Sequence, residues 1–200
     1  EPRVHLERNG FGLGVDIHGS YVAHVEGDGT GGSLAIGHYR DAKLNMHRYD
    51  DVRFTGAPRF AHDGNLIGAC GDSICEILAA DVARAAQGTV PPLRRVPLPA
   101  TGLGRSNALK DPLGCLWFRS SLRAGFRCPN DSKFHFLPLD AAEVTQFNSL
   151  TLGPGNRLWF VSDAGLLTFG RPGDFRTIGP QQGMPRLTES VYCAREGSVW

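Results

Sequence analysis

The residue types best suited to chemistry occur in short, isolated motifs. Residues 70–75 spell Cys-Gly-Asp-Ser-Ile-Cys, and Gly-Asp-Ser opens the nucleophile motif of one class of lipolytic serine hydrolases. A nucleophilic Ser73 would need a general base and an acid that orients it, but no Asp-x-x-His sequence follows. Asp and Ser are also common turn residues, so the segment is predicted to be a turn and not a catalytic site.

Two pairs of potential metal ligands are present, Asp16-x-His18 and His24-x-Glu26. A zinc site needs three or four protein ligands, and no third ligand stands at a supportive spacing from either pair. The acidic pair at 50–51 is interpreted as a polar corner and not as an acid–base pair. The sequence therefore predicts no catalytic residue, no metal site and no cofactor.

The composition favours short strands and turns over long helices. Of 200 residues, 26 are Gly and 13 are Pro, while 41% are hydrophobic, which is enough apolar material to bury a core. The formal net charge is +1 with no basic block, so no nucleic-acid partner is predicted. No apolar run approaches the roughly 18 residues that cross a bilayer. The chain begins at Glu1, and we expect either a removed leader or a fragment.

The cysteines are odd in number and contain no Cys-x-x-Cys pair, which argues against a zinc site and against a fully paired disulfide framework. Cys70 and Cys75 could meet across a hairpin. The favoured interpretation is that all five are small buried or half-buried side chains. They are Cys70, Cys75, Cys115, Cys128 and Cys193.

A glycine ahead of an apolar, often aromatic, pair recurs along the chain. It begins at Gly19 and continues at Gly64, Gly114, Gly155 and Gly197, at spacings of 45, 50, 41 and 42 residues. A period in the forties filled with short strands is typical of a β-propeller, in which each repeat forms one four-stranded blade. The predicted fold class is therefore all-β, a partial propeller ring of about four and a half blades.

The repeat divides the chain into blades. The 50-residue spacing is explained by a short helical insertion near 79–88. The fifth unit stops inside its second strand, so its ring could not close, and we expect the isolated chain to be prone to aggregation. The predicted blades are 1–51 (degenerate), 52–104, 105–145, 146–186 and the start of a fifth at 187–200.

The second strand of the later repeats carries a bulky residue, Trp117, Trp159 or Trp200, with Ile67 in the second repeat. A tryptophan in each blade could form a stacking platform for sugars. A blade must also pack its large face on the next blade. Packing between blades is the favoured interpretation.

Residues 155–200 resemble two successive two-component regulator propeller repeats. In that family each repeat contains an Asp/Glu-Gly-x-Leu/Ile/Val-Trp turn followed by Gly-Leu. The match is good over these 46 residues and weaker in the earlier repeats. The matching positions are Gly155, Leu158, Trp159, Gly165, Leu166, Glu196, Gly197, Val199 and Trp200.

The resemblance implies a non-catalytic sensory or ligand-binding module in the periplasmic, extracytoplasmic part of a membrane-anchored bacterial signal-transduction protein. It also implies that further blades and an output domain, such as a histidine kinase, a diguanylate cyclase or a DNA-binding regulator, lie elsewhere in the same polypeptide. Two alternatives stay open: a propeller enzyme similar to streptogramin lyases, and a scaffold or protein-interaction propeller.

Propeller topology brings the starts of the innermost strands together at one mouth of the central channel. The residues predicted there are polar and differ between blades, which suits a small polar ligand or a protein partner. Channel mouths are also wet and polar without any ligand. The candidate ligand-facing residues are Arg105, Asn107, Gln146, Asn148, Thr188 and Glu189.

Overall fold

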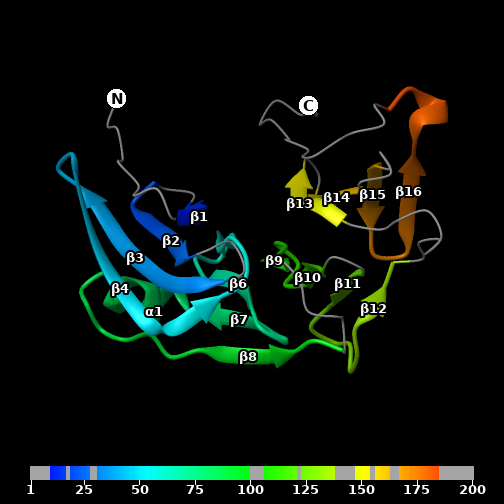
Figure 1. Ribbon diagram of the computed structural model, residues 1–200. Helices are drawn as coiled ribbons and strands as arrows, with labels where there is room; N and C mark the ends of the chain where they lie inside the picture. Colours follow the sequence, from blue (N-terminus) through cyan, green and yellow to red (C-terminus); the bar gives the residue numbers. More distant parts are fainter. Residues whose placement is uncertain are drawn as a thin grey trace. The chain divides into compact units, whose positions relative to one another are not determined.

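The computed structural model describes residues 10–16, 19–27, 31–99, 106–120, 123–137, 147–153, 156–162 and 167–184. The chain divides into two compact units, 1–110 and 111–200. Within the described residues the strands form four antiparallel sheets of four strands each, and neighbouring strands in each sheet are also neighbours in sequence (Figure 1).

The first sheet contains β1 (Gly10–Val15), β2 (Tyr21–Gly27), β3 (Gly32–Arg40) and β4 (Lys43–Phe54). The β3–β4 hairpin closes with Asp41 and Ala42, both at positive φ, which is the geometry that two-residue hairpin turns require. Near the other end of β4 the pairing register shifts, because Leu34 lies opposite Tyr49 whereas Ser33 lies opposite Arg53. Three residues of β4 therefore form an irregularity of the bulge type at 50–52.

The second sheet contains β5 (Arg59–Phe60), β6 (Leu66–Cys70), β7 (Ser73–Ile77) and β8 (Arg94–Pro97). Helix α1 (Ala79–Ala85) lies between β7 and β8, inside the stretch where the sequence indicates an insertion. Pro97 stands at the end of β8, the edge strand, where a missing backbone N–H is tolerated.

The remaining two sheets follow the same order. The third contains β9 (Asn107–Lys110), β10 (Leu116–Arg119), β11 (Ala124–Arg127) and β12 (His135–Phe136). The fourth contains β13 (Phe147–Gly153), β14 (Arg157–Ser162), β15 (Leu167–Arg171) and β16 (Asp174–Ile178), and a short 3-10 helix at Pro180–Gln182 follows it. The four-stranded units predicted from the repeat are therefore present.

The core of the first unit lies where the first two sheets and α1 meet. Leu34 and Phe54 of the first sheet pack in one cluster with Leu66 of the second sheet and Val82 of α1, and all four are at most 1% exposed. Gly68 makes room for Phe54, since a Cβ at Gly68 would stand 2.2 Å from the aromatic ring. Neighbouring blades thus share a continuous apolar layer.

Trp117 is the centre of the aromatic core of the second unit. Its ring lies 6.2 Å from Phe160 and 5.9 Å from Phe175, both in the fourth sheet, and 4.6 Å from Phe126 in its own sheet. Trp117 is fully buried. Its aromatic faces are occupied by protein side chains and are not open to a stacked sugar.

In the second, third and fourth sheets, the turn between the first and second strands contains one residue with a positive, left-handed φ. Gly64 and Gly114 adopt φ of +78° and +84° three residues before Ile67 and Trp117. In the fourth sheet the same place, three residues before Trp159, is held by Asn156 with φ of +58°. Asn accepts this conformation more readily than other residues with a Cβ. Gly155, the predicted member of the series, lies outside the described residues, as do Gly165, Leu166, Gly197 and Trp200.

Candidate functional site

The predicted channel-mouth residues are only partly within the described structure. Asn107 is the first residue of the inner strand β9. Asn148 lies in the inner strand β13, and only its backbone is described. The other four candidates lie outside the described residues. They are Arg105, Gln146, Thr188 and Glu189.

Asn107 stands close to the connection that leads into the neighbouring inner strand β5. A Cβ at Gly56, in the connection between β4 and β5, would lie 2.6 Å from Asn107 Oδ1 and 1.9 Å from the carbonyl oxygen of Ser106. Where β1 approaches the same connection, a Cβ at Gly14 would lie 2.7 Å from the carbonyl oxygen of Pro58. Glycine is needed at both places because the neighbouring backbone occupies the space of a side chain.

Arg59, the first residue of β5, is a further candidate that the glycine repeat does not reveal. It lies opposite Ile67, as Thr151 lies opposite Trp159 in the fourth sheet. The sequence signal that could have identified Arg59 is its positive charge, because the matching position of the fourth sheet holds a small, neutral residue. In the register of the fourth sheet this position lies three residues further along the inner strand than Asn148, so Arg59 places a cationic side chain on an inner strand beyond the predicted mouth residues.

The Arg59 side chain is half-buried and has no counter-charge in the described part of the chain. Its Nε is buried and has no hydrogen-bond partner there, and burial lowers the pKa of Arg59. A guanidinium still stays protonated at neutral pH. A half-buried, uncompensated charge costs some folding free energy, and an anionic ligand would reduce that cost.

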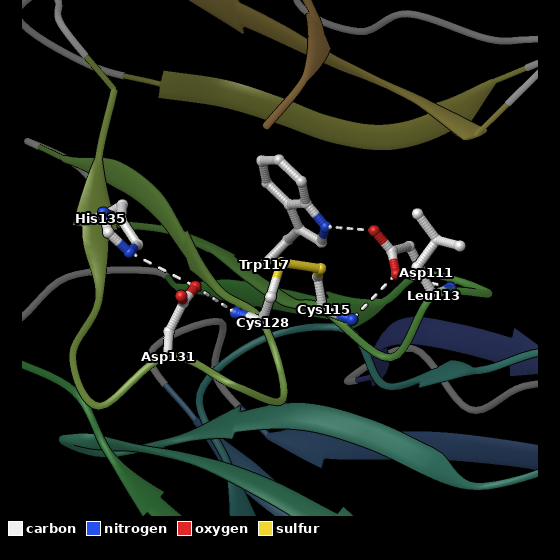
Figure 2. The surroundings of a disulfide bond; sticks show 7 residues. All are labelled: Asp111, Leu113, Cys115, Trp117, Cys128, Asp131 and His135. Carbon is white, nitrogen blue, oxygen red and sulfur yellow. Dashed lines mark hydrogen bonds and ion pairs between the residues drawn. A yellow bond between two sulfur atoms is a disulfide. The ribbon is translucent and has the colours of Figure 1, made fainter. Parts of the chain in front are cut away.

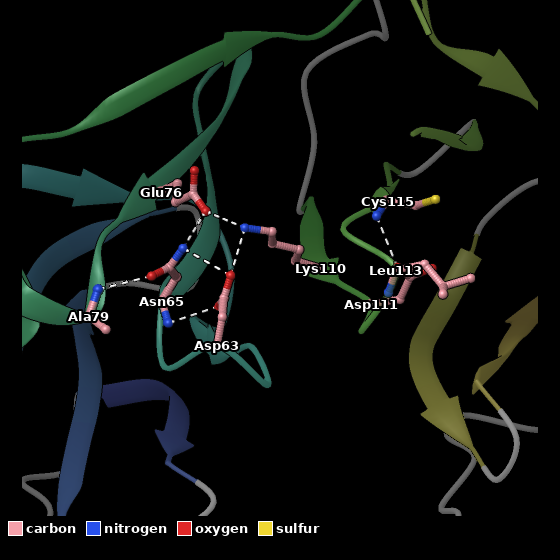
Figure 3. A network of polar contacts seen from close by, with 8 residues as sticks. All are labelled: Asp63, Asn65, Glu76, Ala79, Lys110, Asp111, Leu113 and Cys115. Atoms are coloured by element: carbon pink, nitrogen blue, oxygen red, sulfur yellow. Dashed lines mark hydrogen bonds and ion pairs between the residues drawn. The ribbon is translucent and has the colours of Figure 1, made fainter. Parts of the chain in front are cut away.

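A polar network ties β9 to the second sheet at the opposite end of the blade (Figure 3). Lys110 Nζ lies 2.8 Å from Asp63 Oδ2 and 2.8 Å from Glu76 Oε1. Asn65 Nδ2 donates to the same two carboxylates, and Asn65 Oδ1 accepts from the backbone N–H of Ala79. Every polar group is matched by a partner, so this network is structural and not an open site.

We expect Lys110→Met to lower the free energy of unfolding by about 1–2 kcal/mol, because two partly enclosed carboxylates lose their shared cation. Burial opposes ionisation of Asp63, but the hydrogen bond and charge of Lys110 together with the backbone N–H of Asn65 outweigh burial and lower the pKa of Asp63. The stabilisation is therefore complete above pH ~4 and is lost as the pH falls through the lower native pKa. Urea unfolding between neutral and acidic pH should show a smaller acid-side loss in Lys110→Met than in the wild type. An unchanged acid-side slope would contradict this assignment.

Four of the five cysteines are paired, which corrects the expectation of unpaired side chains. Cys70 and Cys75 form one disulfide and Cys115 and Cys128 a second, with Cα–Cα distances of 5.9 and 3.9 Å. Both link the second and third strands of a blade: Cys70 ends β6 and Cys75 lies in β7, whereas Cys115 and Cys128 directly flank the paired residues Leu116 and Arg127. Cys193 lies outside the described residues.

Asp111 organises the turn next to the second disulfide (Figure 2). Its Oδ1 accepts hydrogen bonds of 2.9 Å from the backbone N–H groups of Leu113 and Cys115, and its Oδ2 accepts one of 2.9 Å from Trp117 Nε1. At the far side of the disulfide, Asp131 Oδ2 accepts from the backbone N–H of Cys128. The carboxylate of Asp111 is therefore fully used in holding the turn and the core tryptophan.

The motifs considered for chemistry have ordinary surroundings. Ser73 Oγ donates to Asp72 Oδ1 at 3.0 Å, at the start of a strand. Glu26 forms an ion pair of 2.8 Å with Arg48, and Asp50 Oδ1 accepts from Arg48 Nε and Ser33 Oγ. Among the residues with a described placement, no group of three or more His, Cys, Asp or Glu side chains is arranged to hold a metal ion.

The described sheets are each a four-stranded antiparallel meander whose innermost strand follows a between-blade connection, and this is the architecture of β-propeller blades. No family model matches the sequence, and no curated protein sequence matches it. Among the helices of the described part, none is long and apolar enough to span a bilayer.

Solved propeller structures are similar to this chain. A catalytically inactive virginiamycin B lyase from Staphylococcus aureus, determined with quinupristin, superposes with a TM-score of 0.62 at 16% identity, over 88% of this chain and 58% of the lyase chain. Regucalcin from Agrobacterium tumefaciens, described as a calcium-binding protein, gives 0.59 at 16% identity, over 96% and 66%. A functionally unknown protein from Desulfotomaculum acetoxidans gives 0.63 at 11% identity, over 98% and 64%.

These likenesses confirm the predicted fold class, an all-β propeller-repeat protein. The chain spans 58% of the lyase chain and 66% of the regucalcin chain. Similar propellers thus include an enzyme and a calcium-binding protein, and a structure of a nidogen–laminin complex also matches, with a TM-score of 0.59. The finer assignment to the two-component regulator repeats is not confirmed by these comparisons and stays a prediction.

Proposed function

We propose that this chain is a non-catalytic, ligand-binding part of the sensory propeller of a membrane-anchored bacterial signalling protein. The observation that carries ligand binding is the half-buried Arg59 side chain on an inner strand, whose buried Nε has no hydrogen-bond partner and no counter-charge in the described residues. The ligand is a small polar molecule with an anionic group, bound at the end of the blades where the inner strands begin. Arg59 supplies the charge, and Asn107 stands on the next inner strand.

The disulfides support the extracytoplasmic location in this proposal. Disulfides persist in oxidising compartments such as the bacterial periplasm and are rare in the cytosol, and this chain pairs Cys70 with Cys75 and Cys115 with Cys128. The resemblance of residues 155–200 to two-component regulator repeats supports the signalling role. Further blades and an output domain would then belong to the same polypeptide. The alternatives, a streptogramin-lyase-like enzyme and a scaffold propeller, rest on likeness in fold alone.

Arginine Nε–H signals in NMR spectra test the binding role, with sodium acetate and sodium phosphate as probes at constant ionic strength. We expect the Arg59 Nε–H signal, assigned by its loss in Arg59→Gln, to shift in a saturable way with at least one probe. Arg59→Gln should also raise the unfolding temperature, because it removes an uncompensated charge. Arg40→Gln, at a side chain that is 77% exposed, is the matched control. An Arg59 signal that responds to neither probe, together with a destabilised Arg59→Gln variant, would show that Arg59 is structural.

A further inference from the structure

A cationic pocket lies in the first unit, between the end of β4 and the β6–β7 turn. Its volume is about 400 Å³, within the range of small-molecule sites, and Arg53, Thr55, Cys70 and Arg95 are among the residues that line it. β6 runs antiparallel to β5, so its end lies at the same end of the blade as the start of β5. The pocket therefore opens at the end where propeller ligands are expected.

The irregularity at 50–52 changes which side chains of β4 face the core: Tyr49 is in the core, and in a regular strand Arg53, four residues later, would face the core as well. Val52 and Phe54 are buried in the core shared by the first two sheets. Alternation along a strand then turns Asp51 and Arg53 away from that core, and both are exposed. Arg95 comes from the edge strand β8, with its Nη1 3.8 Å from the Sγ of Cys70.

The charges in the pocket are unbalanced. Two guanidinium groups, those of Arg53 and Arg95, line it with a single carboxylate, that of Asp51. Within the described part of the chain, neither arginine forms an ion pair with an acidic side chain. The nearby Asp50 carboxylate is already engaged, with Arg48 Nε at 2.6 Å.

Thr55 supplies an independent observation that points to a ligand. Its Oγ1 is buried and has no hydrogen-bond partner in the described residues, although buried hydroxyls are almost always hydrogen-bonded. Thr55 lines the same pocket as the two arginines. A hydroxyl with an unused donor beside two guanidinium groups is suited to an oxygen anion.

We propose that this pocket binds a small molecule that carries a carboxylate or phosphate group. Arg53 and Arg95 bind the anionic oxygens, Thr55 Oγ1 donates a hydrogen bond to them, and Asp51 accepts one from a hydroxyl or amine group of the same ligand. The site is distinct from Arg59. Arg59 pairs with Ile67, whereas Cys70 is three residues further along β6, and side chains an odd number of residues apart point to opposite faces of a sheet.

Calorimetric titration of the Arg59→Gln variant tests this pocket separately from the site proposed above. Inorganic phosphate and acetate, at constant ionic strength, are the probes that distinguish the two anion classes. We expect one of them to bind, and Arg53→Gln and Arg95→Gln each to weaken that binding about tenfold or more, as expected for a lost charge-assisted hydrogen bond. Thr55→Val should weaken it a few-fold, and Asp51→Asn should strengthen it by removing a like charge.

Arg94→Gln is the matched control, because Arg94 is the neighbouring arginine on β8, is exposed and does not line the pocket. Binding to Arg94→Gln should equal binding to its parent. The absence of binding by both probes would overturn the proposal. An equal loss in Arg94→Gln and Arg95→Gln would also overturn it, since the effect would then reflect net charge and not this pocket.

Discussion

Asp111→Ala should lower the free energy of unfolding by about 3–5 kcal/mol. Three donors depend on this carboxylate: two backbone N–H groups of its turn and the Nε1–H of Trp117. Asp111 and Trp117 are 4% and 0% exposed, so water cannot readily replace the lost acceptor. Each buried donor left without a partner costs about 1–3 kcal/mol.

Asp111→Asn separates the contribution of the turn hydrogen bonds from that of the Trp117 hydrogen bond. The amide oxygen can still accept from the turn, but the amide nitrogen would face the Nε1–H of Trp117, donor against donor. We expect a loss of about 1–3 kcal/mol from this one contact. In a Trp117→Phe background the same substitution should cost much less, because the indole donor is absent, and the double-mutant cycle would measure the coupling.

Urea unfolding followed by tryptophan fluorescence and by circular dichroism is the measurement for the alanine variant. Asp131→Ala is the control: Asp131 also accepts from a backbone N–H near the second disulfide, but its side chain is 30% exposed. We expect its loss to stay within about 1 kcal/mol. If Asp111→Ala and Asp131→Ala cost the same, the indole contact does not contribute to stability.

The blade architecture could be predicted from the sequence because it depends on a repeated local rule. Each blade needs a tight turn before its second strand and a bulky residue that packs on the next blade, and both recur in the sequence at a nearly constant spacing. The rule fails in detail where another residue meets the same backbone requirement. Asn156 takes the left-handed conformation that Gly64 and Gly114 take in earlier blades, so an alignment on glycine alone is displaced by one residue.

The disulfides and the cationic sites could not be predicted in the same way. Cysteine pairing depends on which residues face each other across a hairpin, and the spacing of Cys115 and Cys128 gives no register until Leu116 is known to pair with Arg127. The burial of the Arg59 Nε depends on tertiary packing, which a cationic residue in the sequence does not reveal. Arg53 is turned into its pocket by the irregularity at 50–52, which the alternation of residue types does not reveal.

Removing the Cys115–Cys128 disulfide should cost about 3 kcal/mol, whereas removing Cys70–Cys75 should cost about 2 kcal/mol. The reason is the length of chain that each disulfide closes: the sequence separations are 13 and 5 residues, and a longer loop loses more entropy in the unfolded state. Serine replaces both cysteines of a pair in each variant, so that no single thiol is left to form wrong disulfides.

Thermal and urea unfolding of the two double-serine variants, with and without dithiothreitol, measures these costs. The wild type should lose stability when it is reduced, and each variant should lose only the part due to the disulfide that it retains. Reductant should therefore destabilise the Cys70→Ser, Cys75→Ser variant more than the Cys115→Ser, Cys128→Ser variant. The longer loop also joins the two strands that carry Trp117 and Phe126, so its loss should loosen the aromatic core and change the tryptophan fluorescence before global unfolding. If reductant leaves the unfolding midpoint of the wild type unchanged, the disulfides contribute no stability, and their support for an oxidising compartment is lost as well.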